Sequence, residues 1–191
     1  MSKPSLVIVL AEDQRQQQFI YRYLKSADIR PSQIRFHISP SGRGSAEQWV
    51  RKSFVVQVRT CRARHAQTGM FVMLDADTNT VLERLRTLDE ELGSAGQRPI
   101  DQDRDSIARL IPKRNIETWI LVLSMQGRSQ RVDEFSDYKP TKSSEDWTAL
   151  IPAAAATLVA WMRPSATLPI NLIDSLRQGI REIPYALPPG R

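Results

Sequence analysis

Two short, uninterrupted apolar runs constrain the fold of this chain more than any other feature. Residues 6–10 read LVIVL and residues 70–74 read MFVML. A run of this length and composition is typical of a strand that helices bury on both faces of a parallel sheet. Both runs are too short to cross a membrane. We therefore predict an α/β domain in which the two runs are buried strands.

The remaining segments alternate between helical and strand-like periodicity, which supports this prediction. The elements that we expect up to residue 125 are a strand at 6–10, a helix at 14–27, a strand at 34–38, a helix at 46–65, a strand at 70–74, a helix that Thr78 or Asn79 caps and Gly93 ends, a strand at 106–111, and a helix at 116–125 that Asn115 caps. These elements predict a mostly parallel sheet of about four strands that is flanked by helices.

The C-terminal third has only helical periodicity. Beyond Gly127 a long polar stretch continues to Ser144, and two helices are expected at 145–162 and 170–180. We therefore divide the chain into a core at residues 1–125 and a loop and helical extension, residues 126–191, that packs on this core.

Composition limits the compartment and the partners. Lys and Arg number 27 against 21 Asp and Glu, so that 27 − 21 gives a net charge of +6. This charge is compatible with a polyanionic partner, although it is also an ordinary route to solubility. The single cysteine, Cys61, excludes an internal disulfide and a cysteine zinc site. With no signal peptide or membrane span, we expect a cytoplasmic protein without a membrane partner.

Acidic residues follow both apolar runs. Glu12 comes after the first, and Asp75 and Asp77 come after the second. In open α/β sheets, ligands bind outside the carboxyl ends of the strands. If the segment is extended, Asp75 and Asp77 project to the same side. Because carboxylate oxygens suit Mg²⁺ or Mn²⁺, we predict a metal site made of these three residues. The alternative is that a single Asp after a strand merely caps the next helix.

A glutamate at the end of the first strand with an Asp-x-Asp motif at the end of a later strand resembles the Toprim domain of topoisomerases, primases and OLD-type nucleases. The pieces that carry the resemblance are residues 6–12, the Gly42-Arg43-Gly44-Ser45 loop, residues 71–77 and residues 111–119. Together they span roughly the first two thirds of the chain. Asp13 follows Glu12 where the family usually has a glycine. The resemblance implies a Rossmann-like Toprim core.

The resemblance also implies a reaction. Metal-dependent cleavage or joining of strands would use Glu12 as a general acid/base or a ligand, with Asp75 and Asp77 as ligands of Mg²⁺ or Mn²⁺. The expected chemistry is phosphodiester hydrolysis of DNA or RNA. Residues 111–119 also look like a segment of small stand-alone Toprim-like proteins in bacterial defence loci. This likeness implies an antiviral effector that works with an ATPase partner or as a homo-oligomer.

Several further residues are candidates for the same site. Glu117, one turn into a predicted helix, can join the metal ligands, although stabilisation of the helix N-terminus explains it equally well. Cationic residues that can neutralise phosphates are Arg43, Lys113 and Arg114 in loops, and Arg51, Lys52, Arg59 and Arg62 on one side of a helix. Ordinary solvation is the alternative role for all of them.

Other readings of the same motifs remain open. A haloacid-dehalogenase-like phosphatase would use Asp75 as its nucleophile, but its Asp-x-Asp normally ends the first strand and Glu12 would have no role. A glycosyltransferase Asp-x-Asp has less support. A non-catalytic or partner-activated binding subunit would keep the site without cutting by itself. We expect no metal role for His37 or His65, which lack a partner at ligand spacing, and core positions for Trp119, Trp147 and Trp161.

Overall fold

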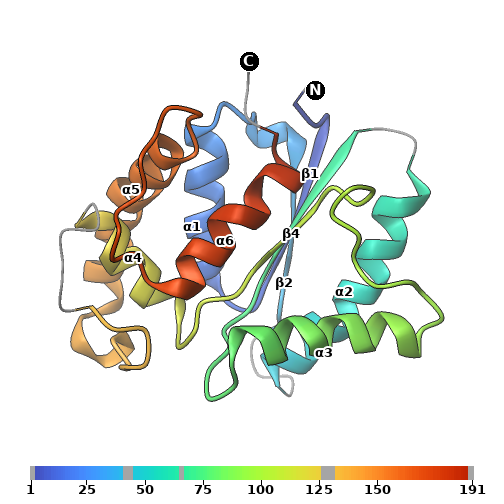
Figure 1. The fold of residues 1–191 in the computed structure, drawn as a ribbon, viewed down its shortest axis with the longest axis horizontal. Coiled ribbons are helices and arrows are strands. Elements are labelled where there is room, and N and C mark those ends of the chain that lie inside the picture. Colours follow the sequence, from blue (N-terminus) through green and yellow to red (C-terminus); the bar gives the residue numbers. More distant parts are fainter. Residues whose placement is uncertain (1–2, 41–44, 65–66, 126–131, 189–191) are drawn as a thin grey trace.

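The computed structural model describes residues 3–40, 45–64, 67–125 and 132–188 (Figure 1). Its centre is a four-stranded sheet in the order β2-β1-β3-β4, with every neighbouring pair parallel. The strands are β1 (Leu6–Ala11), β2 (Ile34–Ile38), β3 (Thr68–Met73) and β4 (Ile107–Leu110). The prediction of an α/β fold with about four parallel strands is therefore confirmed.

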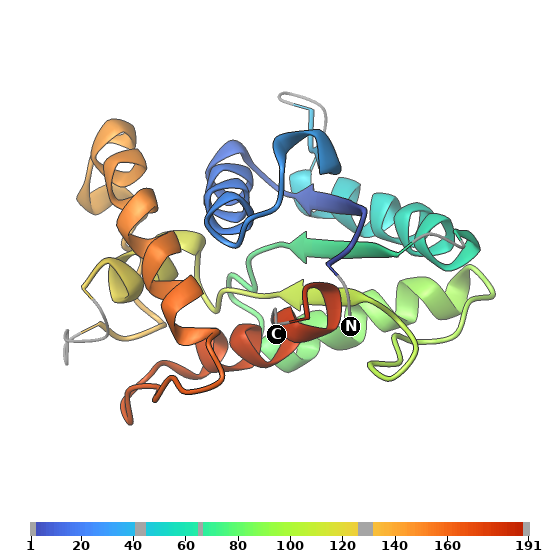
Figure 2. The ribbon, with the colours of Figure 1, turned by 90° about the horizontal axis from the view of Figure 1, so that it is seen from above.

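Helices cover both faces of the sheet (Figure 2). The bounds of the helices in the described residues are α1 (Gln14–Ser26), α2 (Ala46–Ala63), α3 (Val81–Ser94), α4 (Ile116–Ser124), α5 (Ser144–Trp161) and α6 (Asp174–Ala186), with short 3₁₀ turns η1 (Pro31–Gln33) and η2 (Lys139–Thr141). Alternate residues of each strand point to opposite faces, so each face has its own apolar core. One core contains α1, α4, α5 and α6, and the other contains α2 and α3.

The C-terminal helices share the core of the sheet. Helix α6 packs along β4 and β3, and α5 packs against α1 and α4. Trp119 and Trp147 are completely buried between these helices, as expected, whereas Trp161 is partly exposed. The Trp119 indole donates a hydrogen bond to the Ser175 hydroxyl at 2.9 Å. Helix α6 therefore covers β4 and β3 on one face of the sheet.

Four helices lie within two residues of the predicted bounds, whereas the ends predicted for α3 and α6 have to be corrected. Helix α3 is capped by Thr80, whose side chain and that of Glu83 form a capping box, so the Thr78 or Asn79 cap was wrong. Gly93 lies inside this helix, and the left-handed residue that ends it is Gly96, with φ of 68°. Helix α6 begins at Asp174 and ends at Ala186, so the predicted bounds of 170–180 were wrong at both ends. It begins late because the preceding segment is irregular and leaves Ile170 93% exposed.

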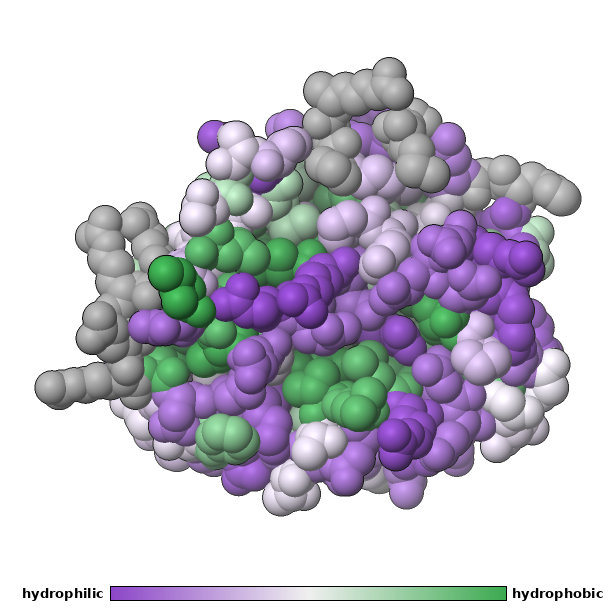
Figure 3. Space-filling view, in the orientation of Figure 1, coloured by the Kyte–Doolittle hydropathy of each residue, from purple (hydrophilic) through white to green (hydrophobic). Residues whose placement is uncertain are grey.

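One face of the molecule is mostly polar. On the face shown in Figure 1, hydrophilic side chains dominate and separate several apolar areas (Figure 3). Among the described residues, no helix combines the length and the apolar character that a membrane span requires.

Candidate functional site

The carboxyl ends of β1 and β3 form the centre of the candidate site. The two strands are neighbours, and Ala11 pairs with Met73 at the last position of the register. Glu12 therefore leaves the sheet beside the segment that carries Asp75. Their contact is direct, since the Asp75 backbone N–H donates to the Glu12 carboxylate at 3.2 Å. The structure thus brings together two of the three predicted metal ligands.

A buried glutamine connects the same two residues. Gln16, on the first turn of α1, is 0% exposed. Its side-chain oxygen accepts a hydrogen bond from the Glu12 backbone N–H at 2.9 Å, and its Nε2 donates to the Asp75 carboxylate at 3.1 Å. Asp13, the N-cap of α1, accepts from the Gln16 backbone N–H at 2.8 Å. Gln16 was not predicted, although its spacing from Phe19 and Tyr23 puts it on the buried face of α1.

The environment of both carboxyl groups opposes their ionisation. Burial raises the pKa of Asp75 well above its ordinary value, and the neighbouring carboxylates of Glu12, Asp13 and Glu117 raise it further. Burial also raises the pKa of Glu12, partly offset by the hydrogen bond from Asp75. Negative charge at this edge of the sheet is therefore unfavourable without a compensating cation.

These carboxyl groups open onto a cavity of about 400 Å³. The charged residues that line it are Glu12, Asp13, Glu47, Asp75, Asp77, Asp137, Arg84, Arg114 and Lys139. Six carboxyl groups thus face three cationic groups. The cavity is also lined by the N-caps of α2 and α4, Ser45 and Asn115, so two helix N-termini lie at its wall.

Asp77 does not lie on an extended segment as predicted. It has φ of 59°, in the left-handed region, because the chain turns here and the Asn79 N–H donates to the Ala76 carbonyl at 3.0 Å. Its side chain is 68% exposed and pairs with Arg114 at 3.3 Å. Asp77 therefore lies at the rim of the cavity, apart from the hydrogen-bonded Glu12 and Asp75.

Glu117 lies behind the site. It is 1% exposed and forms an ion pair with Arg15 of α1. Its charge raises the pKa of Asp75, but its side chain is not part of the cavity wall. Glu117 thus influences the site electrostatically while its carboxylate is already paired.

The predicted cationic residues are divided between paired and unpaired positions. Arg51 pairs with Glu91 and Glu47, and Arg62 pairs with Asp105 at 2.8 Å, so these two do not form a free stripe with the exposed Lys52 and Arg59.

The loop cations stand differently. The Lys113 amine donates to the Asn79 carbonyl at 2.8 Å and so holds the turn after Asp77. Arg43, like His65, lies outside the described residues, whereas His37 is partly exposed on β2.

Two cationic residues of the cavity were not predicted. Arg84 of α3 is buried, pairs with Glu47 and donates to the Ala76 carbonyl at 3.3 Å. Lys139, at η2, makes no ion pair among the described residues, and its charge lowers the pKa of Asp75. No signal in the sequence pointed to Lys139, because it comes from a loop far from either strand end.

The fit of a metal ion to this site is partial. Hard carboxylate oxygens and a local excess of negative charge are what Mg²⁺ or Mn²⁺ requires. Within the described ranges, however, no three Asp, Glu, His or Cys side chains converge in an arrangement ready to hold an ion. Glu12 and Asp75 provide two neighbouring ligands, and a third carboxylate, such as that of Asp77, has to move inward.

Comparison of the chain with protein-family models, with curated proteins and with solved structures finds no match. The function therefore has to be inferred from the geometry and charge of the site itself.

Proposed function

We propose that this protein is a Mg²⁺- or Mn²⁺-dependent nuclease of the Toprim type, which hydrolyses phosphodiester bonds of DNA or RNA. One observation carries the proposal. Glu12 and Asp75, from the ends of two adjacent parallel strands, share a hydrogen bond, have raised pKa values and face a cavity with several further carboxylates. Strongly perturbed carboxyl groups in a cleft are typical of catalytic and metal sites.

The metal would be held by Glu12 and Asp75, with Asp77 as the third ligand after its turn moves inward. When bound, a divalent ion polarises the scissile phosphate and lowers the pKa of a bound water. The raised pKa values are consistent with this role, because a cation at this position would relieve the repulsion between the carboxylates.

The protein's own residues have separate tasks in this proposal. Gln16 orients the Asp75 carboxylate from the buried side. Glu12 exchanges a proton with the reacting water or the leaving oxygen, and its raised pKa favours this role because it lies nearer to the pH of the cell. Lys139 and Arg114 lie on the cavity wall, where their cationic groups would donate hydrogen bonds to a phosphate. The resemblance to defence proteins adds an ATPase partner or self-association to the proposal.

The test is incubation of the purified protein with plasmid DNA and with total RNA, with Mg²⁺, with Mn²⁺ and with a chelator. We expect cutting that requires the metal and is lost in Glu12→Gln and Asp75→Asn. The matched controls are Glu90→Gln on α3 and Asp103→Asn in the loop before β4. Both are exposed and neither lines the cavity, so these variants should cut like the wild type.

Two results would contradict the proposal. Cutting that survives both Glu12→Gln and Asp75→Asn would remove the site from the reaction. Release of phosphate from a small aryl phosphate ester without any cutting of nucleic acid would instead favour the phosphatase reading, in which Asp75 is the nucleophile. That reading would leave Glu12, whose carboxylate accepts a hydrogen bond from the Asp75 backbone N–H, without an assigned role.

A further inference from the structure

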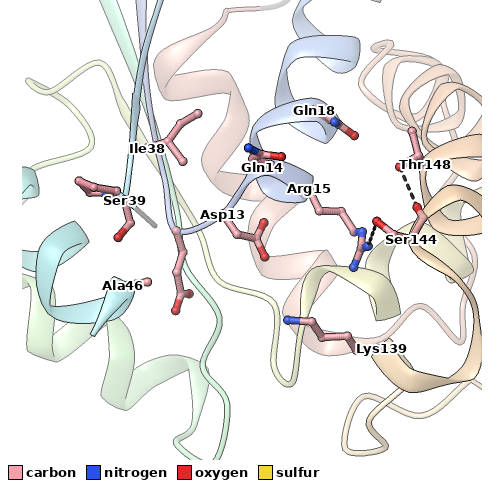
Figure 4. A pocket seen from close by; sticks show the side chains of 12 residues that line it. Asp13, Gln14, Arg15, Gln18, Ile38, Ser39, Ala46, Lys139, Ser144 and Thr148 are labelled. Atoms are coloured by element: carbon pink, nitrogen blue, oxygen red, sulfur yellow. Dashed lines mark hydrogen bonds between the residues drawn. The ribbon is translucent and has the colours of Figure 1, made fainter. Parts of the chain in front are cut away.

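A second and larger cavity adjoins the carboxylate site. It has a volume of about 620 Å³ and shares Glu12, Asp13, Ala46 and Lys139 with the first cavity. It lies between the first turns of α1 and α5 and the end of β2 (Figure 4). Its volume is within the roughly 300 to 1,000 Å³ that small-molecule sites occupy. We call it the α1 groove.

The walls of the α1 groove are held in place. Arg15 pairs with the buried Glu117 through one nitrogen and donates to the Ser144 hydroxyl at 3.1 Å through another. This contact joins α1 to the start of α5 (Figure 4). The Thr148 hydroxyl in turn donates to the Ser144 carbonyl at 2.9 Å. The α1 and α5 side of the groove is therefore held in place, which lowers the entropy cost of binding a ligand there.

The groove offers hydrogen bonds with little net charge. Among its described lining residues, two carboxyl groups, Glu12 and Asp13, face two cations, Arg15 and Lys139, and Arg15 is already paired with Glu117. A groove that tracks the phosphate backbone of a duplex is strongly basic instead. Lys139 is the cation without an ion-pair partner here, and it stands where the two cavities meet. The groove therefore suits the uncharged part of a nucleotide, with one phosphate near Lys139.

Two exposed glutamines provide the groove with hydrogen-bond donors and acceptors. Gln14 and Gln18 are four residues apart on α1, so their side chains project from the same face of the helix into the groove. A glutamine amide combines a donor with an acceptor and pairs with base edges that present the complementary pattern. On the β2 side, Ile38 and Pro40 supply an apolar surface for the face of a base.

From this geometry we infer that the α1 groove binds one unpaired nucleotide next to the scissile phosphate, with its base read by Gln14 and Gln18. The inference rests on the proposed nuclease function and specifies its substrate as a single-stranded polynucleotide. A base inside a duplex is stacked and paired, so its Watson–Crick edge cannot enter such a groove. DNA and RNA present closely similar base edges, so the inference covers both, and the sugar is the group by which a protein can distinguish them.

The test measures binding separately from cleavage. Labelled short homopolymers of each base, as single-stranded DNA and as RNA, are titrated by fluorescence anisotropy with Ca²⁺ in place of Mg²⁺. Blunt-ended duplexes of two separate strands, which contain no unpaired loop, serve as competitors. We expect single strands to bind at least about tenfold more tightly than these duplexes, with a preference among the four bases.

The variants use three glutamines of the same helix. The double variant Gln14→Ala/Gln18→Ala should weaken binding of the preferred homopolymer about tenfold and remove the preference. Gln17→Ala is the matched control, since Gln17 lies between them on α1 without lining either cavity. Blunt-ended duplexes that bind as tightly as single strands, or a double variant that binds like Gln17→Ala, would overturn the inference.

The two proposals fail in different ways. Single strands that bind through Gln14 and Gln18 but are never cut with any metal would retain the groove and overturn the nuclease. Metal-dependent cutting of duplexes that is indifferent to the double variant would retain the nuclease and overturn the groove.

Discussion

At the scale of single residues, the site depends on a polar side chain that water does not reach. Gln16 satisfies the Glu12 backbone N–H and orients the Asp75 carboxylate from the protein interior. Both ends of this buried amide are hydrogen-bonded. Loss of either contact would leave an unpaired group, at a cost of about 1 to 3 kcal/mol. In the proposed nuclease Gln16 would be a positioning residue that acts through Asp75 and Glu12.

We predict that Gln16→Glu shifts the pH dependence of cutting. A second carboxylate beside Asp75 would raise its pKa further, so activity that needs ionised Asp75 would begin at a higher pH. The measurement is the pH profile of kcat/KM, in which the acidic limb should move upward. Gln17→Glu, one position further along α1, is the control and should leave the limb in place. An unmoved limb in Gln16→Glu would show that Gln16 has only a structural role.

Asp75 should also reduce the stability of the metal-free protein near neutral pH. Its pKa in the folded protein is raised above the ordinary value of 3.8. Between these two values the folded state binds more protons than the unfolded state, so stability decreases as the pH rises through this window. We expect Asp75→Asn to be more stable than the wild type at neutral pH and to lose that advantage below about pH 4, where both states are protonated. Thermal unfolding at a series of pH values measures the difference.

Mg²⁺ or Mn²⁺ should reverse this order. Binding to the folded state stabilises by about 2.7 kcal/mol when the ion is at about a hundred times its Kd. The wild type should therefore gain stability with added ion, and Asp75→Asn should gain much less. An equal gain in the two proteins would place the ion somewhere else.

At the scale of elements, helix α6 depends on a glycine. A Cβ on Gly179 would collide with the buried Trp119 ring, whereas one on Gly93 of α3 would meet no atom within 4 Å. Gly179→Ala should therefore destabilise the protein by about 1 to 3 kcal/mol. Gly93→Ala should stabilise it by about 0.5 to 1 kcal/mol, because alanine loses less entropy in a helix. Chemical denaturation measures both, and similar effects of the two variants would contradict the close packing.

Elements were predicted well where one physical effect dominates. The runs at residues 6–10 and 70–74 are so apolar that burial alone makes them β1 and β3. The start of α6 was misplaced because helical periodicity continues into residues 170–173, which lie before the helix in an irregular segment. The ends of α3 depended on which of three polar residues caps it and on which of two glycines takes a positive φ, and periodicity does not distinguish these choices.

The site was predicted in part for the same reason. Strand ends in a parallel sheet meet at one edge, so Glu12 and Asp75 followed from the sequence. Asp77 was misjudged because the turn after β3 depends on contacts with Lys113 and Arg114 that come from another strand end. Gln16 belongs to the site because it is buried beside it, and Lys139 because a loop distant in the sequence brings it there. A local sequence pattern reveals neither of these contacts.

At the scale of the whole molecule the net charge is +6, but among the described residues that line the two cavities cationic groups do not outnumber carboxyl groups. Arg15, Arg51, Arg62, Arg84 and Arg114 all have carboxylate partners. We therefore predict that binding of a single strand depends only weakly on salt. If about two phosphates are neutralised, one of them by Lys139, log K should fall against log salt with a slope of about −1.4. Titrations at several salt concentrations measure the slope, which Lys139→Ala should halve. A slope several times steeper would reveal a broad basic surface.

The sheet order has a consequence for the time course of folding. Glu12 and Asp75 are 63 residues apart along the chain, and they meet only when β1 has paired with β3, after the intervening α1, β2 and α2. Such distant pairings form slowly, because a long loop has to close before they contribute any stability. We expect α1 and α2 to appear early, while the two carboxyl groups are still far apart. In a chain that has not finished folding, the residues of the site are therefore not yet assembled. Any activity should appear with the last kinetic phase of refolding.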